Sequence, residues 1–354
     1  MRRMFFAMLA LLLPVLACGA QEDMNDALAQ AYAGLDGTGK RPALDAGKDY
    51  RKAVGRAWRS YQKRIGTPAA NWAKTTIGPV GGTVFYPFSG PDLVTAMTMF
   101  PEADRYVLVA IQSAQAPVNP AALDDERRRA FFDKFQVEWQ RYGILGFFRT
   151  LDLDEDAQDS VARIGVTPVL MAFAARMGYQ VRAVEPLVFD ITQGEYVAAE
   201  SRAKPAWRSV RLQLHVQERP VTVDYVRLDL SDGFLKAHPE AKEWLERQAG
   251  NPTLLKAASH LLQDRSFSIL RDALVGRAPL VVQDETGLDY GDLARIGPVK
   301  LYGSFTRAHA LFDSKRQKSL ADAYRSAQGS VDPLPFAFSY QKDAEQRSLQ
   351  VVRR

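Results

Sequence analysis

The sequence contains little cysteine and little histidine. Cys18 is the single cysteine among 354 residues, which excludes an internal disulfide and a metal cluster bound by several thiolates. The four histidines are dispersed, and no two of them have the spacing of metal ligands. We therefore expect no metal site. The histidines are His215, His238, His260 and His309.

A hydrolase signature and a strong charge imbalance are also missing. The chain has no Gly-x-Ser-x-Gly elbow, and Phe88-Ser89-Gly90 matches it only in part. The formal net charge is +5, and it falls to +3 once residues 1–20, which include Arg2 and Arg3, are removed. A balance this mild gives no reason to expect nucleic acid as a partner.

The N-terminus has the pattern of a secretory signal over residues 1–20. Two arginines precede an apolar run, residues 5–16, which is too short to span a bilayer. Small residues follow, and cleavage after Ala20 would release the chain into the periplasm. Val15-Leu16-Ala17-Cys18 also resembles a lipobox, in which Cys18 would be lipidated and would anchor the protein to the membrane. The sequence thus predicts an exported protein of the bacterial envelope and leaves both forms open.

Residues 83–112 carry the clearest fold signal. β-Branched and aromatic residues at 83–86 predict a strand, and Pro87 bounds it. Asp92 can cap a helix over 93–100 that Pro101 stops, and a second strand is predicted over 105–112. Strand, loop, helix and strand form the minimal unit of a parallel α/β sheet.

The other patterns complete one α/β domain. Residues 21–75 predict a helical N-terminal segment, and 76–354 the α/β domain. Alternating residues at 210–216 and 221–225 predict an antiparallel hairpin within an insertion around 178–231. We expect a mostly parallel, Rossmann-like sheet flanked by helices, with this hairpin as an extension. Further predicted elements are helices over 239–248, 252–262 and 312–327, a strand over 279–283, and a closing strand pair, 334–340 with 348–352.

Polar residues follow two of the predicted strands. Ligands of open α/β sheets bind outside the carboxyl ends of the strands, so we predict a ligand site there. Loop amides and Ser89 would bind the ligand, and the acids would accept its hydroxyls or bind a cation. Alternatively, Asp92 only caps a helix and the later acids form a solvated turn. The predicted ligand-binding residues are Ser89, Gly90 and Asp92 after the first strand, and Gln283, Asp284, Glu285 and Thr286 after residues 279–283.

The chain resembles an uncharacterised family of bacterial exported proteins in four segments. These are Val84-Phe85-Tyr86-Pro87-Phe88-Ser89-Gly90-Pro91-Asp92 and residues 280–287, 334–336 and 348–349. The resemblance implies no activity. Residues 83–112 are also similar, more remotely, to the first strand, loop, helix and second strand of Rossmann-like methyltransferases. In these enzymes the loop backbone approaches S-adenosylmethionine and an acid ending the second strand holds the ribose. Here the loop keeps one glycine, Gly90, and the strand ends in Ile111-Gln112.

Three functions follow from these patterns. The leading one is a binding module of the cell envelope, for a small molecule or an envelope component. The alternative is an envelope hydrolase or a degenerate methyltransferase-like enzyme with Asp92 or Asp284 as general base; a raised carboxylate pKa in a closed pocket would favour it. The third is an assembly protein whose aromatic helix, residues 124–142, forms an exposed partner surface. No cofactor is predicted from the residues themselves.

Overall fold

The computed structural model describes Gln21 and residues 23–36, 44–146, 164–199, 206–313, 315–338, 340 and 346–354. The predicted signal segment and Cys18 lie outside the described residues. Within them, no helix combines the length and the apolar character that crossing a bilayer requires.

The predicted strand, helix and strand around Asp92 are present. β1 (Thr83–Pro87) pairs in parallel with β2 (Arg105–Ala110), and α4 (Leu93–Met99) connects them. The Asp92 side chain accepts a hydrogen bond from the backbone N–H of Thr95, so it caps α4 as expected. Every residue of α4 is buried.

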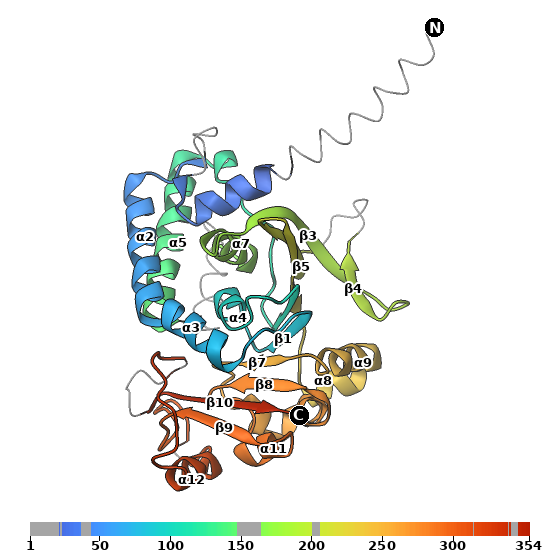
Figure 1. Cartoon of the computed structure of the whole chain (residues 1–354). Helices are drawn as coiled ribbons and strands as arrows, with labels where there is room; N and C mark the ends of the chain where they lie inside the picture. The colour runs from blue at the N-terminus through green and yellow to red at the C-terminus, as the bar shows by residue number, and fades with distance from the viewer. Residues whose placement is uncertain are drawn as a thin grey trace.

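The sheet has ten strands in the order β4-β3-β5-β6-β2-β1-β7-β8-β10-β9 (Figure 1). The five central strands, β6 to β8 in this order, pair with one another in parallel. Both flanks are antiparallel, so the sheet is mixed rather than mostly parallel. The remaining strands are β3 (Gln180–Asp190), β4 (Glu195–Ala198), β5 (Ser209–Val216), β6 (Arg219–Arg227), β7 (Thr253–Leu255), β8 (Leu280–Gln283), β9 (Val299–Gly303) and β10 (Ser348–Arg353).

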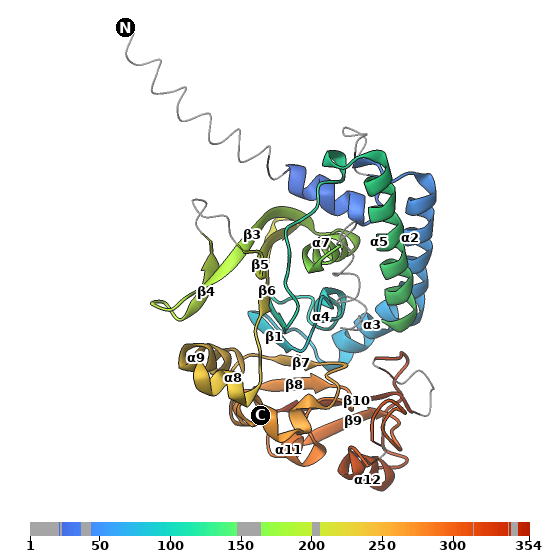
Figure 2. The same cartoon turned by 180° about the vertical axis from the view of Figure 1, so that it is seen from behind.

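Helices cover both faces of the sheet (Figures 1 and 2). Side chains alternate between two cores because successive strand residues point to opposite faces: Val84 and Tyr86 join one core, and Phe85 joins the other. The helices that contribute side chains to the first core are α2 (Lys48–Tyr61), α3 (Thr67–Thr76), α4, α5 (Asp125–Leu145) and α7 (Val166–Arg176). Those that contribute to the second core are α8 (Asp232–Ala237), α9 (Pro239–Gln248), α10 (Ser268–Arg277) and α11 (Tyr290–Ala294).

The predicted hairpin is present as β5 and β6, with Val210 opposite Tyr225. Its second strand also pairs in parallel with β2, so it belongs to the centre of the sheet as well as to the extension. The long strand β3 and the short strand β4 widen this flank.

Three other elements differ from the prediction. Residues 252–262 are not a helix: they contain β7, a central strand, because a short apolar run that is buried on both sides has no periodicity to separate strand from helix. The helix expected over 312–327 begins only at Lys318 as α12 (Lys318–Ser326). β10 pairs with β8 and β9 rather than with residues 334–340.

The aromatic residues of α5 do not form a partner surface. Phe131, Phe135 and Trp139 are all buried. They pack against α2, α7 and the helical segment at residues 23–32, for example through Tyr32 and Phe173. The assembly hypothesis therefore loses the exposed patch on which it depended.

Candidate functional site

A cavity of about 350 Å³ lies at the carboxyl ends of four neighbouring parallel strands. The chain proceeds from β1 to β2 and β6 in one direction across the sheet, whereas β7 and β8 extend in the other. The cavity therefore adjoins the point where the strand order reverses, which is where open α/β sheets bind ligands. Its lining comprises Phe88 and Gly90 after β1, Ala110, Ile111 and Gln112 at the end of β2, Leu228, Asp229 and Leu230 after β6, Ala257, Ala258, Ser259 and Leu261 after β7, and Phe267.

The loops around the cavity have an unusual backbone. Phe88, Ala257 and Ser259 line it with φ values of 60°, 53° and 54°, although none of them is glycine. The left-handed region costs such residues about 1–3 kcal/mol each, and it persists only where the surroundings enforce it. Gly90, with φ 52°, adopts the same region without this penalty. Strain concentrated at one cavity is typical of a functional site.

Gln112 lines the cavity and carries a buried, unsatisfied polar group. Its side chain is only 9% exposed, and its amide nitrogen has no hydrogen-bond partner within the described part of the chain. The Gln112 carbonyl accepts a hydrogen bond from the Tyr225 hydroxyl at 3.1 Å, which fixes the residue at the end of β2. A buried amide donor without a partner costs about 1–3 kcal/mol, and a ligand acceptor would remove this cost.

Two further polar residues and two aromatic rings complete the lining. Asp229 is exposed after β6, and its carboxylate accepts the backbone N–H of Ser231 at 2.8 Å. The Ser259 hydroxyl lies 3.1 Å from the Tyr340 hydroxyl. Phe88 and Phe267 meet edge to face, with ring centroids 5.6 Å apart. The cavity thus combines apolar and aromatic walls with a few polar groups, as small-molecule sites do.

Asp92 lies below the residues that line the cavity. It is the centre of a buried network and does not itself line the cavity. It forms an ion pair with Lys256, with 2.7 Å between Oδ2 and Nζ, and both side chains are at most 3% exposed. Lys256 also donates to the Thr95 hydroxyl and to the Gly146 carbonyl. The hydroxyls of Tyr86 and Tyr142 donate to the Asp92 carboxylate at 3.1 and 3.0 Å. Burial raises the pKa of both tyrosines well above its usual range, so they stay protonated donors.

Asp284 holds the loop after β7 from the other side. Its carboxylate accepts the N–H of Ala257 at 2.7 Å and both the N–H and the hydroxyl of Thr286. The Thr286 hydroxyl in turn accepts the N–H of Ala258 at 2.7 Å. Lys256 binds Asp92, which follows β1, and Ala257 binds Asp284, which follows β8. The two sets of predicted ligand-binding residues are therefore linked through the end of β7. The acids support the strained loop and do not open into the cavity.

Glu285 and Gln283 lie deeper in the protein. Glu285 is 1% exposed, and its carboxyl accepts the Ser348 hydroxyl at 3.0 Å. Burial raises the pKa of Glu285 well above its usual range, and the neighbouring Asp284 raises it further. Gln283 binds the backbone N–H and carbonyl of Leu288, both at 3.0 Å, and so shapes the turn after β8.

Of the seven predicted ligand-binding residues, Gly90 lines the cavity. Ser89 is buried, and its hydroxyl donates to the Val109 carbonyl at 3.4 Å. The residues that the sequence did not single out are Gln112, Asp229, Lys256 and the segment 257–259. Lys256 and this segment were missed because they were assigned to a helix. For Asp229 the available signal was its place after the second strand of the predicted hairpin.

Among the described residues, no cluster of three or more histidine, cysteine, aspartate or glutamate side chains can hold a metal ion. Comparisons of the chain with family models, curated proteins and solved structures give no match.

Lys256→Met should destabilise the protein by about 3–5 kcal/mol, because it leaves the buried Asp92 carboxylate without its cation. Urea denaturation measures this change. Lys242→Met is the matched control: the side chain of Lys242 is 39% exposed in its ion pair with Glu246, and its loss should cost less than about 1 kcal/mol. Equal costs for the two variants would contradict the role given to Lys256.

Glu285→Gln should change how stability depends on pH. The folded-state pKa of Glu285 is raised above its unfolded-state value of about 4. Below about pH 4 the carboxyl is protonated in both states and costs no stability. As the pH rises towards the folded-state pKa, the unfolded chain ionises first, and the folded protein loses stability relative to it. The neutral variant avoids the loss. Its stability relative to the original chain should therefore increase with pH, by up to about 1.4 kcal/mol per pH unit.

Chemical denaturation between about pH 5 and about pH 8 tests this expectation, since the range lies above the usual glutamate pKa. Glu102→Gln, at an exposed position, serves as the control. Stability curves for Glu285→Gln and the original chain that run parallel across this range would show that Glu285 ionises normally.

Proposed function

We propose that this chain is an exported protein of the bacterial cell envelope that binds a small molecule carrying a nucleoside or a similar flat ring with hydroxyls. The ligand would occupy the cavity at the carboxyl ends of β1, β2, β6 and β7. The observation that carries the proposal is that Gln112, whose buried amide nitrogen has no partner among the described residues, lines a cavity framed by strained loops. The cost of this arrangement is recovered only when a ligand binds.

The chemistry of the lining supports the ligand class. Phe88 and Phe267 provide ring surfaces for a flat base. Asp229 is an acceptor for sugar hydroxyls, and the Gln112 amide is a donor to a ring nitrogen or a hydroxyl. The cavity of about 350 Å³ lies at the small end of the range for ligand sites.

A binding role is favoured over catalysis. Among the described residues that line the cavity, Asp229 is the one carboxylate, and it is exposed to solvent. Glu285, whose pKa is raised, lies behind the loops rather than in the cavity. General acid–base catalysis needs titrating groups within reach of the substrate, and among the described lining residues the exposed Asp229 is the single carboxylate that could serve.

The strand order supports a methyltransferase-like enzyme as the second candidate. Numbered along the chain, β6-β2-β1-β7-β8 has the order 3-2-1-4-5 of doubly wound nucleotide-binding folds. Gln112 stands near the end of β2, where an acid holds the ribose of S-adenosylmethionine in those enzymes. Asp229, after the neighbouring strand β6, is the nearest available carboxylate in the lining. Methyl transfer would require S-adenosylmethionine itself to bind, and tighter binding of it than of adenosine would favour this candidate.

Calorimetric titration of the full chain with adenosine and with S-adenosylmethionine tests both candidates. We expect adenosine to bind and Asp229→Asn to weaken it about tenfold or more, because a hydrogen bond to a charged group contributes about 1.5–3 kcal/mol. Free ribose is the control and should bind far more weakly, since it lacks the ring. If neither adenosine-bearing compound binds, the nucleoside class is wrong.

Gln112→Leu should have opposite effects on stability and on binding. Without ligand, the variant should be more stable by about 1 kcal/mol, because it removes an unsatisfied buried amide. Its affinity for the ligand should fall up to about tenfold through the lost hydrogen bond. Thermal unfolding with and without adenosine measures both changes. Gln213→Leu is the matched control on β5, where the amide oxygen already accepts the Thr222 hydroxyl; it should not gain stability.

A further inference from the structure

A buried histidine lies directly next to the wall of the cavity. His260 follows Ser259, which lines the cavity, and the histidine is 1% exposed. Its ring meets Phe312 edge to face, with ring centroids 4.7 Å apart. The Nε2 atom has no hydrogen-bond partner within the described part of the chain. A titratable ring that is shielded from solvent therefore adjoins the proposed binding site.

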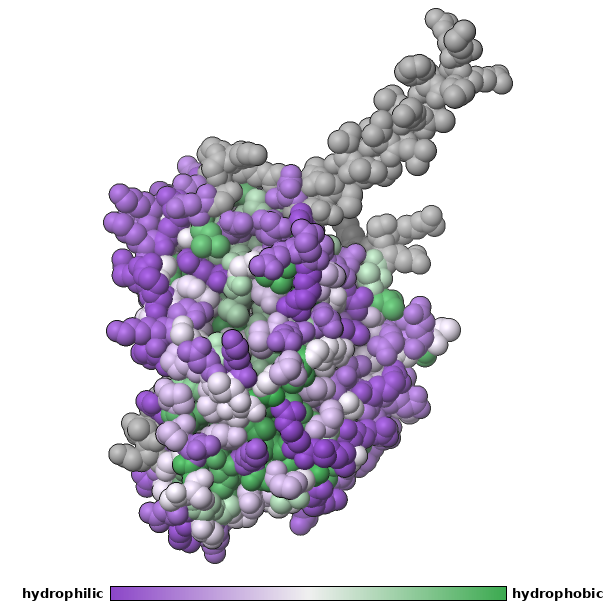
Figure 3. Space-filling model, viewed as in Figure 1, coloured by the Kyte–Doolittle hydropathy of each residue, from purple (hydrophilic) through white to green (hydrophobic). Residues whose placement is uncertain are grey.

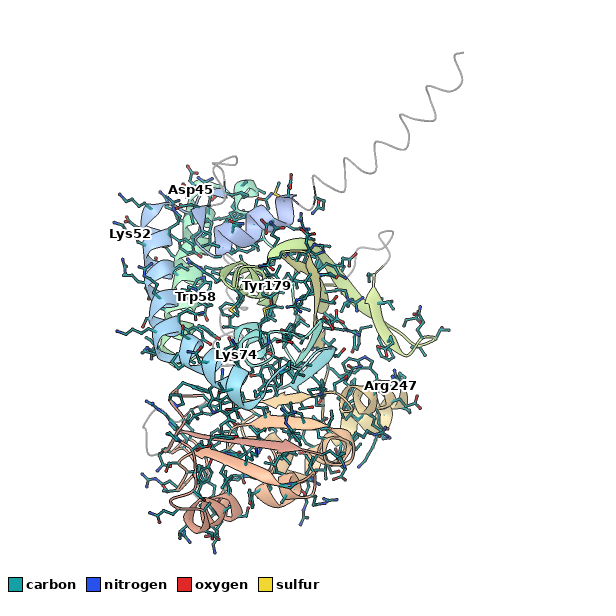
Figure 4. The ribbon with its side chains drawn as sticks, viewed as in Figure 1. Asp45, Lys52, Trp58, Lys74, Tyr179 and Arg247 are labelled. Atoms are coloured by element: carbon teal, nitrogen blue, oxygen red, sulfur yellow. The ribbon has the colours of Figure 1, made fainter. Side chains whose placement is uncertain are left out.

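The part of the chain after β9 covers this histidine, and both Phe312 and Tyr340 belong to it. Figure 3 shows hydrophobic residues at the surface over the lower half of the molecule, where β7 to β10 lie. The red loops after β9 lie beside the ends of β7 and β8 in Figure 1, and side chains crowd the space between them in Figure 4. Such surroundings disfavour a charge on the ring.

Gln263 fixes the protonation state of His260. The Gln263 amide nitrogen lies 3.0 Å from Nδ1 of His260 and 3.0 Å from the Gly287 carbonyl oxygen. A carbonyl oxygen can only accept, so the amide nitrogen is the donor to both atoms. Nδ1 is therefore an acceptor, and the ring is neutral with its proton on Nε2. A second proton, on Nδ1, would meet an amide group that offers it no acceptor.

Three charged groups of the described chain act on the ring, and each already has a partner. Asp284 accepts the backbone N–H of Ala257 at 2.7 Å. Asp264 and Arg316 form an ion pair at 2.8 Å. Burial lowers the pKa of His260 most, the two carboxylates oppose this and Arg316 adds to it, so the pKa lies below its usual value.

The backbone around His260 is strained and is held by hydrogen bonds. Three of residues 257–260, none of them glycine, have φ values of 53°, 54° and 59°. Such conformations persist only where the surroundings enforce them. The backbone N–H of His260 donates to the Thr286 carbonyl at 3.0 Å, and the Gln263 amide binds Gly287. Loss of these bonds would let the segment relax.

We propose that protonation of His260 detaches residues 257–263 from residues 286–287 and thereby weakens ligand binding. The charged ring leaves the Gln263 amide for water, and the strained backbone relaxes with it. Binding depends on this segment because it contributes four residues to the cavity lining, which are Ala257, Ala258, Ser259 and Leu261. This consequence rests on the proposed function, whereas the detachment itself does not.

The direction of the pH dependence follows from the two states of the segment. In the detached state the ring is in water, where its pKa is about 6.5, and in the attached state burial lowers the pKa of His260. Above about pH 6.5 the ring is neutral in both states, and the attached state is favoured. Below this pH the detached state takes up the proton first, and its population rises by up to about tenfold per pH unit.

Proton NMR and hydrogen–deuterium exchange of the full chain test the switch without a ligand. We expect the ring signal that is lost in His260→Asn to titrate with a pKa below about 6.5. The amides of residues 257–263, corrected for the intrinsic pH dependence of exchange, should lose up to about tenfold of their protection per pH unit below that value. A ring pKa at or above about 6.5, or unchanged protection between about pH 7.5 and about pH 5.5, overturns the proposal.

His260→Asn should abolish the response of the segment to pH. Asparagine tolerates a left-handed backbone, keeps an acceptor close to the position of Nδ1, and does not titrate. His215→Asn on β5 is the matched control and should keep the response. The proposal fails if His260→Asn responds to pH as the original chain does. Exchange in the original chain decides the proposal even where this variant does not fold.

Calorimetric titration with adenosine tests the consequence for binding. One pH unit below the midpoint of the ring titration, about one molecule in eleven has the neutral ring, so the affinity should be about tenfold weaker than at about pH 7.5. His260→Asn should show no such loss, which separates the switch from any titration of Asp229. Equal affinities of the original chain at both pH values overturn the proposal. If adenosine binds at neither pH, the proposed function is wrong, and the exchange measurement still decides whether the segment detaches.

Discussion

The buried ion pair between Lys256 and Asp92 is the interaction on which the rest of the structure depends. Asp92 caps α4 and follows β1, Lys256 follows β7, and the Gly146 carbonyl that Lys256 binds ends α5. One ammonium group therefore ties two central strands to two helices of one layer. Two charges taken out of water are costly, and this cost is tolerated only with full hydrogen bonding. Thr95, Tyr86 and Tyr142 provide that hydrogen bonding.

This network explains how the loops above it can be strained. Phe88 and Ala257 adopt left-handed backbone conformations only a few residues from Asp92 and Lys256. The ion pair holds one end of each loop, and Asp284 holds Ala257 from the third strand, β8. If the proposed ligand binds here, loops held in this way lower the entropy cost of binding, because they are ordered beforehand. The acids at the strand ends thus fix the backbone around the cavity, and Gln112 and Asp229 are the residues that we propose as ligand contacts.

The sequence predicted the parts of the fold that have strong local signals. The strand at 83–86, the cap at Asp92 and the hairpin at 210–225 follow from β-branched residues, a capping carboxylate and alternation, and all are present. The strand β7 could not be found in this way, because Thr253, Leu254 and Leu255 are buried on both faces and carry no period. Missing β7 also concealed Lys256 and the loop after it. Whether Ser89 or Asp284 touches a ligand was likewise beyond the sequence, since each binds a backbone group that is distant along the chain, Val109 and Ala257 respectively.

Buried charged groups also contribute to the cohesion of the protein. With Cys18 as its single cysteine, the chain gains no stability from an internal disulfide, so cohesion between layers rests on its two cores and on the Lys256 network. Arg105 and Arg211 likewise share the buried Asp224. Because these three residues lie on β2, β5 and β6, this second group of charges ties three neighbouring strands together.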